Sequence, residues 1–398
     1  SIRQYARERL EASGDTVAVR RRHADHYVAV AETAGPHLRS RDQIEWAQVV
    51  LCDTDNFRAV LDWAVEAPSP EHALRLVAPL SVHGMAIGEA AADWAETASA
   101  IPGGEDHPLF AVVASWAAFG ATMAGDLEQA DARVADAERA QGRLELHLPS
   151  VARSREVLAF FHGDLEQARY HAEEWVALAQ ASGEAYELAF AQIALAGTLM
   201  PDLDAAIATL YEALRVARDA GILCALSIGL PFLAGILPIE QSARALALLD
   251  EAIEVGTKIG DRMGVSQAAL SKGGIGAQRG EWRTVLQTAV DAAVQKLQLG
   301  DLRSVGASFE LAVIAFCALG HLEPAAMLTG CIDASFAALT ERLAPHWWRD
   351  LFATAHTALL DTFGEQQVAT LAAQGAALEV TDAVAYLRAQ AEPVLEAD

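Results

Sequence analysis

Two histidines near the start of the chain have a spacing that could place metal ligands on one face of a helix. His23 and His26 are three positions apart, with Asp25 between them, and such positions are neighbours on a helix surface. A zinc site also needs a third protein ligand or an H-E-x-x-H motif, and neither is recognisable here. We interpret the pair as part of a helix surface beside the arginines at 20–22, and expect no metal and no cofactor.

Two segments imitate catalytic loops without the residues that the chemistry requires. Residues 264–268, Gly-Val-Ser-Gln-Ala, approach the nucleophile elbow of hydrolases but lack its final glycine and a preceding strand. The glycine-rich run at 272–280 comes nearest to a phosphate-binding G-x-x-x-x-G-K-[ST] loop, which the chain does not contain. The D-D-x-x-D motif of an all-α terpene cyclase is also missing. Small residues for close helix contact explain the glycine run, so we expect no enzymatic activity.

Two adjacent tryptophans, Trp347 and Trp348, follow Pro345 at a predicted helix start. Paired tryptophans can build an aromatic cage around a cation. The alternative is that one packs in the core while the other covers a seam between helices. The second arrangement is the commoner one.

The elements that would position these residues come from an internal repeat. Residues 125–130, Gly-Asp-Leu-Glu-Gln-Ala, recur identically at 163–168, which is a spacing of 38 residues. Weaker copies begin at Pro201, Pro238, Gly280 and Gly320. A second series of glycines lies between these turns, at Gly142, Gly183, Gly221, Gly260 and Gly300. Two turns per period predict two helices per period, each ending at a glycine in the left-handed conformation, with an acidic residue capping the next helix.

Composition agrees with stacked helix pairs. The chain is 53% apolar but only 7% aromatic, and its abundant alanine favours helix. Small residues return at Ala130, Ala168 and Ala206, where two helices must approach closely. Because one pair cannot bury its apolar stripe alone, we predict that neighbouring pairs stack on each other.

The repeated turn resembles the G-D-Y-D-E-A centre of tetratricopeptide repeats, although the period is longer than the usual 34 residues of that family. The resemblance implies an all-α, right-handed superhelical solenoid of helix pairs with a period of about 38 residues. We expect repeats at 67–340, a helical segment that starts the domain at 1–66, and capping helices at 341–398.

In the tetratricopeptide register, positions of the first helices line an inner groove. The predicted groove residues are Arg153, Glu310, Phe119, Phe160, Thr122 and Thr198, in rows that also hold Ser115, Val157, Leu195 and Ile314. Such a mixed groove suits a peptide or a modest apolar ligand, with Arg153 placed to bind a carboxylate. The alternative is that some of these side chains pack between helices.

Charge and hydropathy exclude other functions. The formal charge of −25 would repel a phosphate backbone, so we expect no direct contact with nucleic acid. Residues 220–239 carry no charged side chain, but Pro231 and Pro238 interrupt them, and we predict short buried helices there rather than a membrane span. Four scattered cysteines favour buried apolar roles in the cytoplasm over a disulfide framework.

The ends of the chain resemble a further family. Residues 1–10, 20–27 and 53–64 are similar to the segment that follows the ATPase and winged-helix domains in large actinobacterial STAND-class transcriptional regulators, which are signal-transduction ATPases with numerous domains. Residues 375–386 are similar to a segment that often precedes a LuxR-type helix-turn-helix domain in that family. The chain begins at Ser1 without an initiator methionine, so we expect a piece of a larger protein.

This resemblance implies a sensor role without chemistry. The repeat domain would bind a protein or small-molecule inducer and control the protein's own ATPase domain. Arg20, Arg21 and Arg22 would dock onto the rest of that protein, although a solvated face or a nucleic-acid contact is also open. The competing hypothesis is a stand-alone tetratricopeptide-like scaffold that binds a partner peptide, and a phosphate-binding loop encoded upstream of Ser1 would decide between them.

Overall fold

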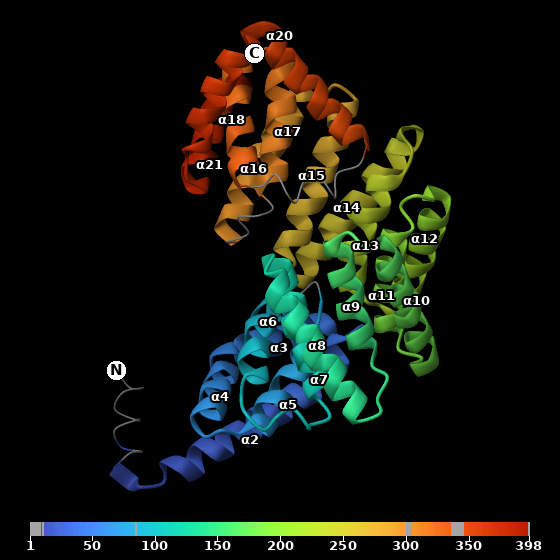
Figure 1. Ribbon diagram of the computed structural model, residues 1–398, viewed down its shortest axis with the longest axis vertical. Helices are drawn as coiled ribbons and strands as arrows, with labels where there is room; N and C mark the ends of the chain where they lie inside the picture. The colour runs from blue at the N-terminus through green and yellow to red at the C-terminus, as the bar shows by residue number, and fades with distance from the viewer. Residues whose placement is uncertain (1–8, 10–11, 84–85, 300–304, 336–345, 397–398) are drawn as a thin grey trace. The chain divides into compact units, whose positions relative to one another are not determined.

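Every regular element of the computed structural model is helical across the residues that it describes, which are 9, 12–83, 86–299, 305–335 and 346–396 (Figure 1). The predicted all-α fold class is therefore confirmed. The helices are α2 (Thr16–Leu38), α3 (Gln43–Cys52), α4 (Thr54–Glu66), α5 (Pro70–Leu80), α6 (Ala86–Ser99), α7 (Phe110–Ala124), α8 (Leu127–Arg143), α9 (Pro149–His162), α10 (Leu165–Ser182), α11 (Ala185–Thr198), α12 (Leu203–Ala220), α13 (Leu223–Ile236), the 3₁₀ turn η1 (Ile239–Gln241), α14 (Ser242–Ile259), α15 (Arg262–Gln278), α16 (Trp282–Leu299), α17 (Val305–Ala318), α18 (Leu322–Ser335), α20 (His346–Ala376) and α21 (Val380–Glu396).

The chain divides into two compact units. Unit 1 comprises residues 1–229 with 258–260, and unit 2 comprises residues 230–257 with 261–398. The boundary between the two units, near residue 230, falls inside the segment 67–340 that was predicted as one run of repeats. The predicted domain boundaries at residues 66 and 340 stay a prediction.

Acidic caps begin the helices as the repeat predicts. The Asp126 carboxylate accepts a hydrogen bond from the backbone N–H of Gln129 at 3.0 Å. Asp164, Asp202 and Asp261 cap their helices in the same way. Each contact satisfies one of the N–H groups that a helix start leaves without a partner, so the predicted caps are confirmed at these four turns.

Glycines end the helices at most of the predicted turns. Positive φ angles occur at Gly125, Gly163, Gly183, Gly221, Gly260, Gly280 and Gly320. The prediction for Gly142 is wrong, because α8 continues through it and the chain adopts its positive φ of 52° at Glu145. Nothing lies within 4 Å of the position that a Cβ of residue 142 would take, so the packing does not require a glycine there. Gly300 lies outside the described residues.

We expect Gly163→Val to lower the free energy of unfolding by about 1 kcal/mol, because a β-branched side chain disfavours positive φ. The φ of Gly163 is 81°, and nothing lies within 4 Å of its Cβ position, so backbone strain is the whole cost. Gly142→Val is the control, since that glycine is helical and equally uncrowded, and it should be neutral or slightly stabilising. Urea denaturation midpoints measure both. Equal effects at the two sites would refute the turn assignment.

Helix pairs in unit 1 stack in the predicted manner (Figure 1). The first helices of successive pairs, α5, α7, α9 and α11, pack against one another, and each also packs against its second helix. Ala130, Ala168 and Ala206 are fully buried in the second helices α8, α10 and α12. In unit 2, α15, α17 and α20 continue this neighbour-to-neighbour packing. Within each unit, these neighbouring pairs therefore cover one another's apolar stripes.

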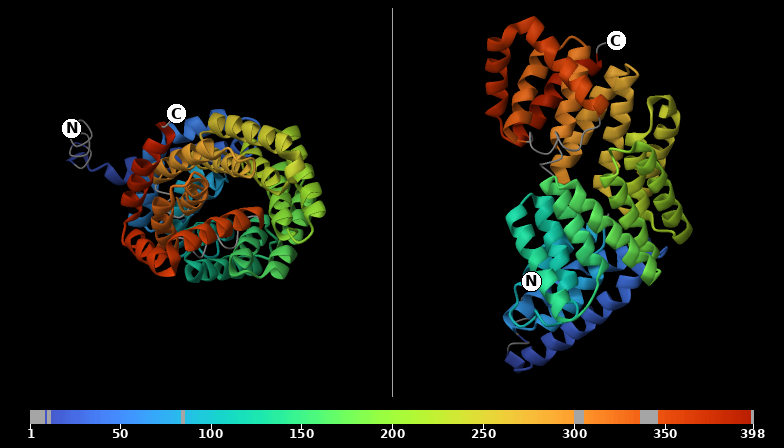
Figure 2. Two further views of the ribbon diagram at one scale, coloured as in Figure 1. Left: turned by 90° about the horizontal axis from the view of Figure 1, so that it is seen from above. Right: turned by 45° about the vertical axis from the view of Figure 1, so that its right-hand side comes forward.

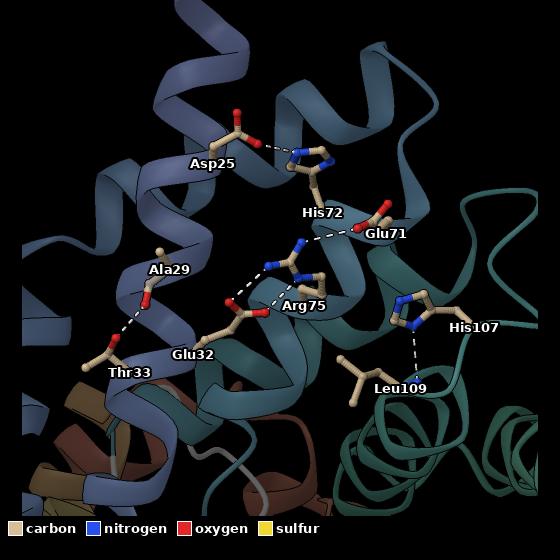
Figure 3. Close-up of polar contacts among 9 residues, drawn as sticks. All are labelled: Asp25, Ala29, Glu32, Thr33, Glu71, His72, Arg75, His107 and Leu109. Carbon is tan, nitrogen blue, oxygen red and sulfur yellow. Dashed lines mark hydrogen bonds and ion pairs between the residues drawn. The ribbon is translucent and has the colours of Figure 1, made fainter.

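Helix α2 packs against α5 within unit 1, and polar side chains join the two helices at the surface (Figure 3). The Arg75 guanidinium on α5 donates to both carboxylate oxygens of Glu32 on α2, at 2.6 and 3.0 Å. These hydrogen bonds lower the pKa of Glu32. His72 Nε2 lies 2.9 Å from the Asp25 carboxylate on α2. The bidentate geometry gives the contact between the two helices directional specificity, although an ion pair this exposed adds little stability.

A glutamine links distant parts of unit 1. Gln43 at the start of α3 is completely buried. Its side-chain amide donates to the carbonyl of Gly221 at 3.0 Å and accepts from the backbone N–H of Cys224 at 3.1 Å. These partners are about 180 positions away in the sequence, so the contacts in unit 1 extend beyond adjacent repeats.

In unit 2, helices α18 and α20 cross at glycines. A Cβ at Gly330 would lie 1.8 Å from the carbonyl oxygen of Ala372, and one at Gly375 would lie 1.8 Å from that of Met327. Helix α20 breaks at Gly364, where φ is 73° and ψ is 162°. The part of α20 after Gly364, which contains Ala372 and Gly375, is the part that crosses α18.

The uncharged stretch at 220–239 forms the short helix α13, with Pro231 inside it. Across the described part of the chain, no helix combines the length and apolarity needed to cross a bilayer. Cys224 and Cys331 are buried as predicted, but Cys52 is exposed, which corrects the prediction of buried roles for all four cysteines. Cys52 is the last residue of α3, and its side chain is exposed.

Candidate functional site

Arg153 occupies an unusual position in unit 1. Its side chain is only 3% exposed on α9, and its guanidinium carbon lies 4.7 Å from the centre of the Trp116 ring on α7. No hydrogen bond or ion pair joins the guanidinium to any other residue that the structure describes, and its Nε is completely buried without an acceptor. Packing of α9 against α7 and α11 therefore buries this cation with its guanidinium over an aromatic ring.

His83 lies beside this cation, between α5 and α6. Its ring centre is 4.7 to 4.8 Å from those of Trp116, Phe119 and Phe190. Its backbone N–H donates to the Tyr186 hydroxyl at 2.8 Å, while its Nε2 is buried without a partner among the described residues. Burial, with the positive charges of Arg153 and Arg39, holds the pKa of His83 well below its usual range. The imidazole is therefore neutral at physiological pH.

A second arginine of this region is fully satisfied. Arg39, just after α2, donates to the carbonyls of Gly35, Pro79 and Ser81 at 2.8 to 3.0 Å. Its guanidinium also lies 5.7 Å from the centre of the Tyr186 ring. It thus supplies partners for carbonyls that the ends of α2 and α5 leave open. Arg39 therefore has acceptors for its N–H groups, whereas the Nε of Arg153 has none among the described residues.

Two acids near Arg153 do not pair with it. The Glu187 carboxylate accepts a hydrogen bond from the Trp175 indole at 2.8 Å and acts on Arg153 only through its field. Burial raises the pKa of Glu156 to about 8, so this carboxyl is mostly neutral at pH 7. Burial also lowers the pKa of Arg153; Glu187 opposes this effect and Arg39 adds to it.

We define the Arg153 cluster by the side chains that surround this cation or act on it electrostatically, which are Arg39, His83, Trp116, Phe119, Arg153, Tyr186, Glu187 and Phe190. Two guanidinium ions and one ionised carboxylate leave the cluster with one surplus positive charge. Of these three charged groups, Arg153 is buried while Arg39 and Glu187 are half-buried, so the Arg153 charge is the one least screened by water.

The structure distributes the predicted groove residues over several environments. Phe119 and Arg153 belong to the Arg153 cluster. Thr122 and Thr198 are buried and donate their hydroxyls to carbonyls of their own helices, at 2.8 Å. Phe160 is half-buried, 6.3 Å from the neighbouring Phe161 ring. A ligand-binding role for these residues stays a prediction.

Glu310 belongs to unit 2 and is buried there. Its carboxylate accepts a hydrogen bond from the Trp348 indole at 2.6 Å. Trp348 therefore packs in the core of unit 2, which agrees with the core alternative for one member of the tryptophan pair. The side chain of Trp347 lies outside the described residues.

The predicted docking residues lie on the surface of α2. Arg20 forms an ion pair with Glu66, and Arg21 and Arg22 are exposed. Nearby, His23 Nε2 lies 3.4 Å from the side-chain oxygen of Asn56. Among the described residues, no three histidine, cysteine or acidic side chains are grouped as metal ligands.

Six members of the cluster were not among the predicted groove residues, namely Arg39, His83, Trp116, Tyr186, Glu187 and Phe190. A signal was present for the aromatic members, because α7 and α11 carry pairs at i,i+3 and i,i+4 in a chain that is otherwise poor in aromatic residues. His83 belongs to no motif, and only the fold places it beside Arg153.

Comparison with known proteins supports the fold. No protein-family model and no curated protein matches the chain. Among solved structures, a Rap protein complexed with Competence and Sporulation Factor matches with a TM-score of 0.53 at 13% identity, over 93% of this chain and 99% of that chain. This likeness shows a tetratricopeptide-like helical repeat fold. A circular tandem repeat protein also aligns, at 13% identity over 95% of this chain and 96% of that chain, but its TM-score of 0.20 carries no argument.

Proposed function

We propose that this chain is the non-catalytic sensor and interaction domain of a STAND-class transcriptional regulator of the cytoplasm. It binds a protein or small-molecule inducer and controls the protein's own ATPase domain, without touching nucleic acid itself. The observation that carries the binding role is the likeness, over nearly the whole length of both chains, to a repeat protein seen in complex with a factor. The regulator assignment depends on the N-terminal sequence resemblance.

Contacts within unit 1 support a link between a bound inducer and the N-terminal segment. Arg39 touches the Tyr186 ring of the Arg153 cluster and the carbonyls at the end of α2. Helix α2 carries Arg20, Arg21 and Arg22 near its other end. An inducer that binds one arrangement of these contacts more tightly than another would shift the population of α2 positions.

The full-length gene product tests this proposal. Removing residues 1–398 should raise its basal ATP hydrolysis, because an inhibitory domain is lost. Charge reversal of Arg21 and Arg22 to glutamate should raise hydrolysis in the same direction if these exposed residues dock onto the ATPase. Arg169→Glu is the control, since Arg169 is also exposed but lies on α10. A reading frame without a phosphate-binding loop would refute the regulator assignment.

The alternative function is a stand-alone scaffold that binds a partner peptide. One observation favours it, because the similar repeat structure, a Rap protein matched over 99% of that chain, is described as complexed with a factor. A phosphate-binding loop encoded upstream of Ser1 in the same reading frame would favour the regulator over the scaffold.

A further inference from the structure

We propose that unit 1 contains a carboxylate-binding site at Arg153, which takes a monoanionic organic acid between the Arg153 guanidinium and the His83 imidazole. This inference rests on the proposed sensor function and specifies the chemistry of its ligand. The decisive geometry is a buried guanidinium and a buried imidazole that both lie 4.7 Å from the Trp116 ring centre. Neither the guanidinium nor the imidazole Nε2 has a hydrogen-bond partner among the described residues.

The energetic argument starts from the cost of a buried ion. An unpaired charge away from water costs several kcal/mol, and proteins therefore pair their buried ions or satisfy them with hydrogen bonds. The other two charged groups of the cluster follow this rule, since Arg39 donates to backbone carbonyls and Glu187 accepts from Trp175. Arg153 alone among these charged groups has no such partner in the described structure. A bound anion would give the Arg153 guanidinium the hydrogen-bond acceptor and the counter-charge that it lacks.

The number and type of donors select a carboxylate. A guanidinium offers two parallel N–H groups that match the two oxygens of a carboxylate. The buried Nε of Arg153 provides one of them, and the His83 Nε2–H tautomer can donate to the same anion. The surplus of one positive charge is neutralised by one negative charge, whereas a phosphate dianion would leave the cluster with an excess of negative charge.

The surroundings restrict the remainder of the ligand. Trp116, Phe119 and Phe190 surround the His83 ring, and the Trp116 face covers the guanidinium. Aromatic surroundings of this kind favour an apolar or aromatic group next to the carboxylate of the ligand. A free organic acid and the C-terminal carboxylate of a peptide share this chemistry.

Thermal unfolding of the whole 398-residue chain tests the site. The probes are sodium acetate and sodium benzoate, compared with sodium chloride at equal ionic strength and with the neutral amides acetamide and benzamide. The tripeptide alanyl-alanyl-phenylalanine, as free acid and as C-terminal amide, distinguishes a peptide from a free acid as the source. We expect at least one acid to raise Tm by about 2 °C or more, and its amide to have no effect.

Variants assign this effect to Arg153. Arg153→Met keeps the apolar stem without the charge, so it should melt above the wild type in chloride and lose the acid-dependent rise. Arg153→Lys keeps the charge without the bidentate fork and should retain a smaller rise. Arg169→Met removes an exposed, ion-paired arginine of α10 and should behave as the wild type.

Two results would overturn the site. One is an acid-dependent rise in Arg153→Met that equals the wild-type rise, and the other is a wild type that responds to none of the acids. Neither result bears on ATPase control, which is measured on the full-length protein. Conversely, a gene without an ATPase would leave the acid-dependent rise intact, so the two proposals fail separately.

Discussion

Replacing Gly330 with alanine is expected to lower the free energy of unfolding of unit 2 by about 3 kcal/mol or more. The added Cβ would lie 1.8 Å from the carbonyl oxygen of Ala372, which is backbone and cannot rotate away. Helices α18 and α20 would have to separate, and the core between them would lose its close packing. The reciprocal variant Gly375→Ala should be as damaging, because its Cβ would meet the Met327 carbonyl at the same distance.

Gly235→Ala is the matched control for this crossing. Gly235 is a helical glycine of unit 2 with nothing within 4 Å of its Cβ position. Alanine there should be neutral or stabilising by up to about 1 kcal/mol, because it is the better helix former. Urea denaturation of the three variants gives the comparison. If Gly330→Ala unfolds at the wild-type midpoint, the close crossing of α18 and α20 is refuted.

Replacing Glu156 with glutamine is expected to change how stability depends on pH. Burial raises the pKa of Glu156 from its ordinary 4.5 to about 8 in the folded chain. Below pH 4.5 the carboxyl is protonated in both states, so its contribution to stability is complete. Between pH 4.5 and 8 the unfolded chain releases the proton while the folded chain keeps it, and this contribution falls as the pH rises. Each pKa unit corresponds to about 1.4 kcal/mol, which limits the loss to about 5 kcal/mol.

Glutamine has a similar shape and no proton to lose, so Glu156→Gln removes this term. The difference in unfolding free energy between variant and wild type should therefore grow in favour of the variant from pH 5 to pH 8, and then level off. Urea denaturation at a series of pH values measures it. Glu166→Gln, at an exposed position of the adjacent helix α10, should show no such trend. A pH-independent difference for Glu156→Gln would show that the carboxyl ionises normally in the folded chain.

The sequence by itself determined the local architecture. The sequence predicted the helix content, the paired turns and the four acidic caps, because each depends on residues within about one helical turn of one another. The caps are Asp126, Asp164, Asp202 and Asp261. Gly142 shows where this reasoning ends, since a glycine permits a helix end but does not require one.

Only the tertiary structure decided which residues from distant repeats meet. It brings Gln43 to Gly221, joins the backbone of Gly330 to that of Ala372, and buries Arg153 beside His83 without an acceptor. These contacts span roughly 40 to 180 positions of sequence and depend on how successive helix pairs stack, which is the sum of many small packing preferences. The spacing of residues in the sequence does not predict the result of so many small preferences. The candidate carboxylate site could therefore be identified only from the packed helices.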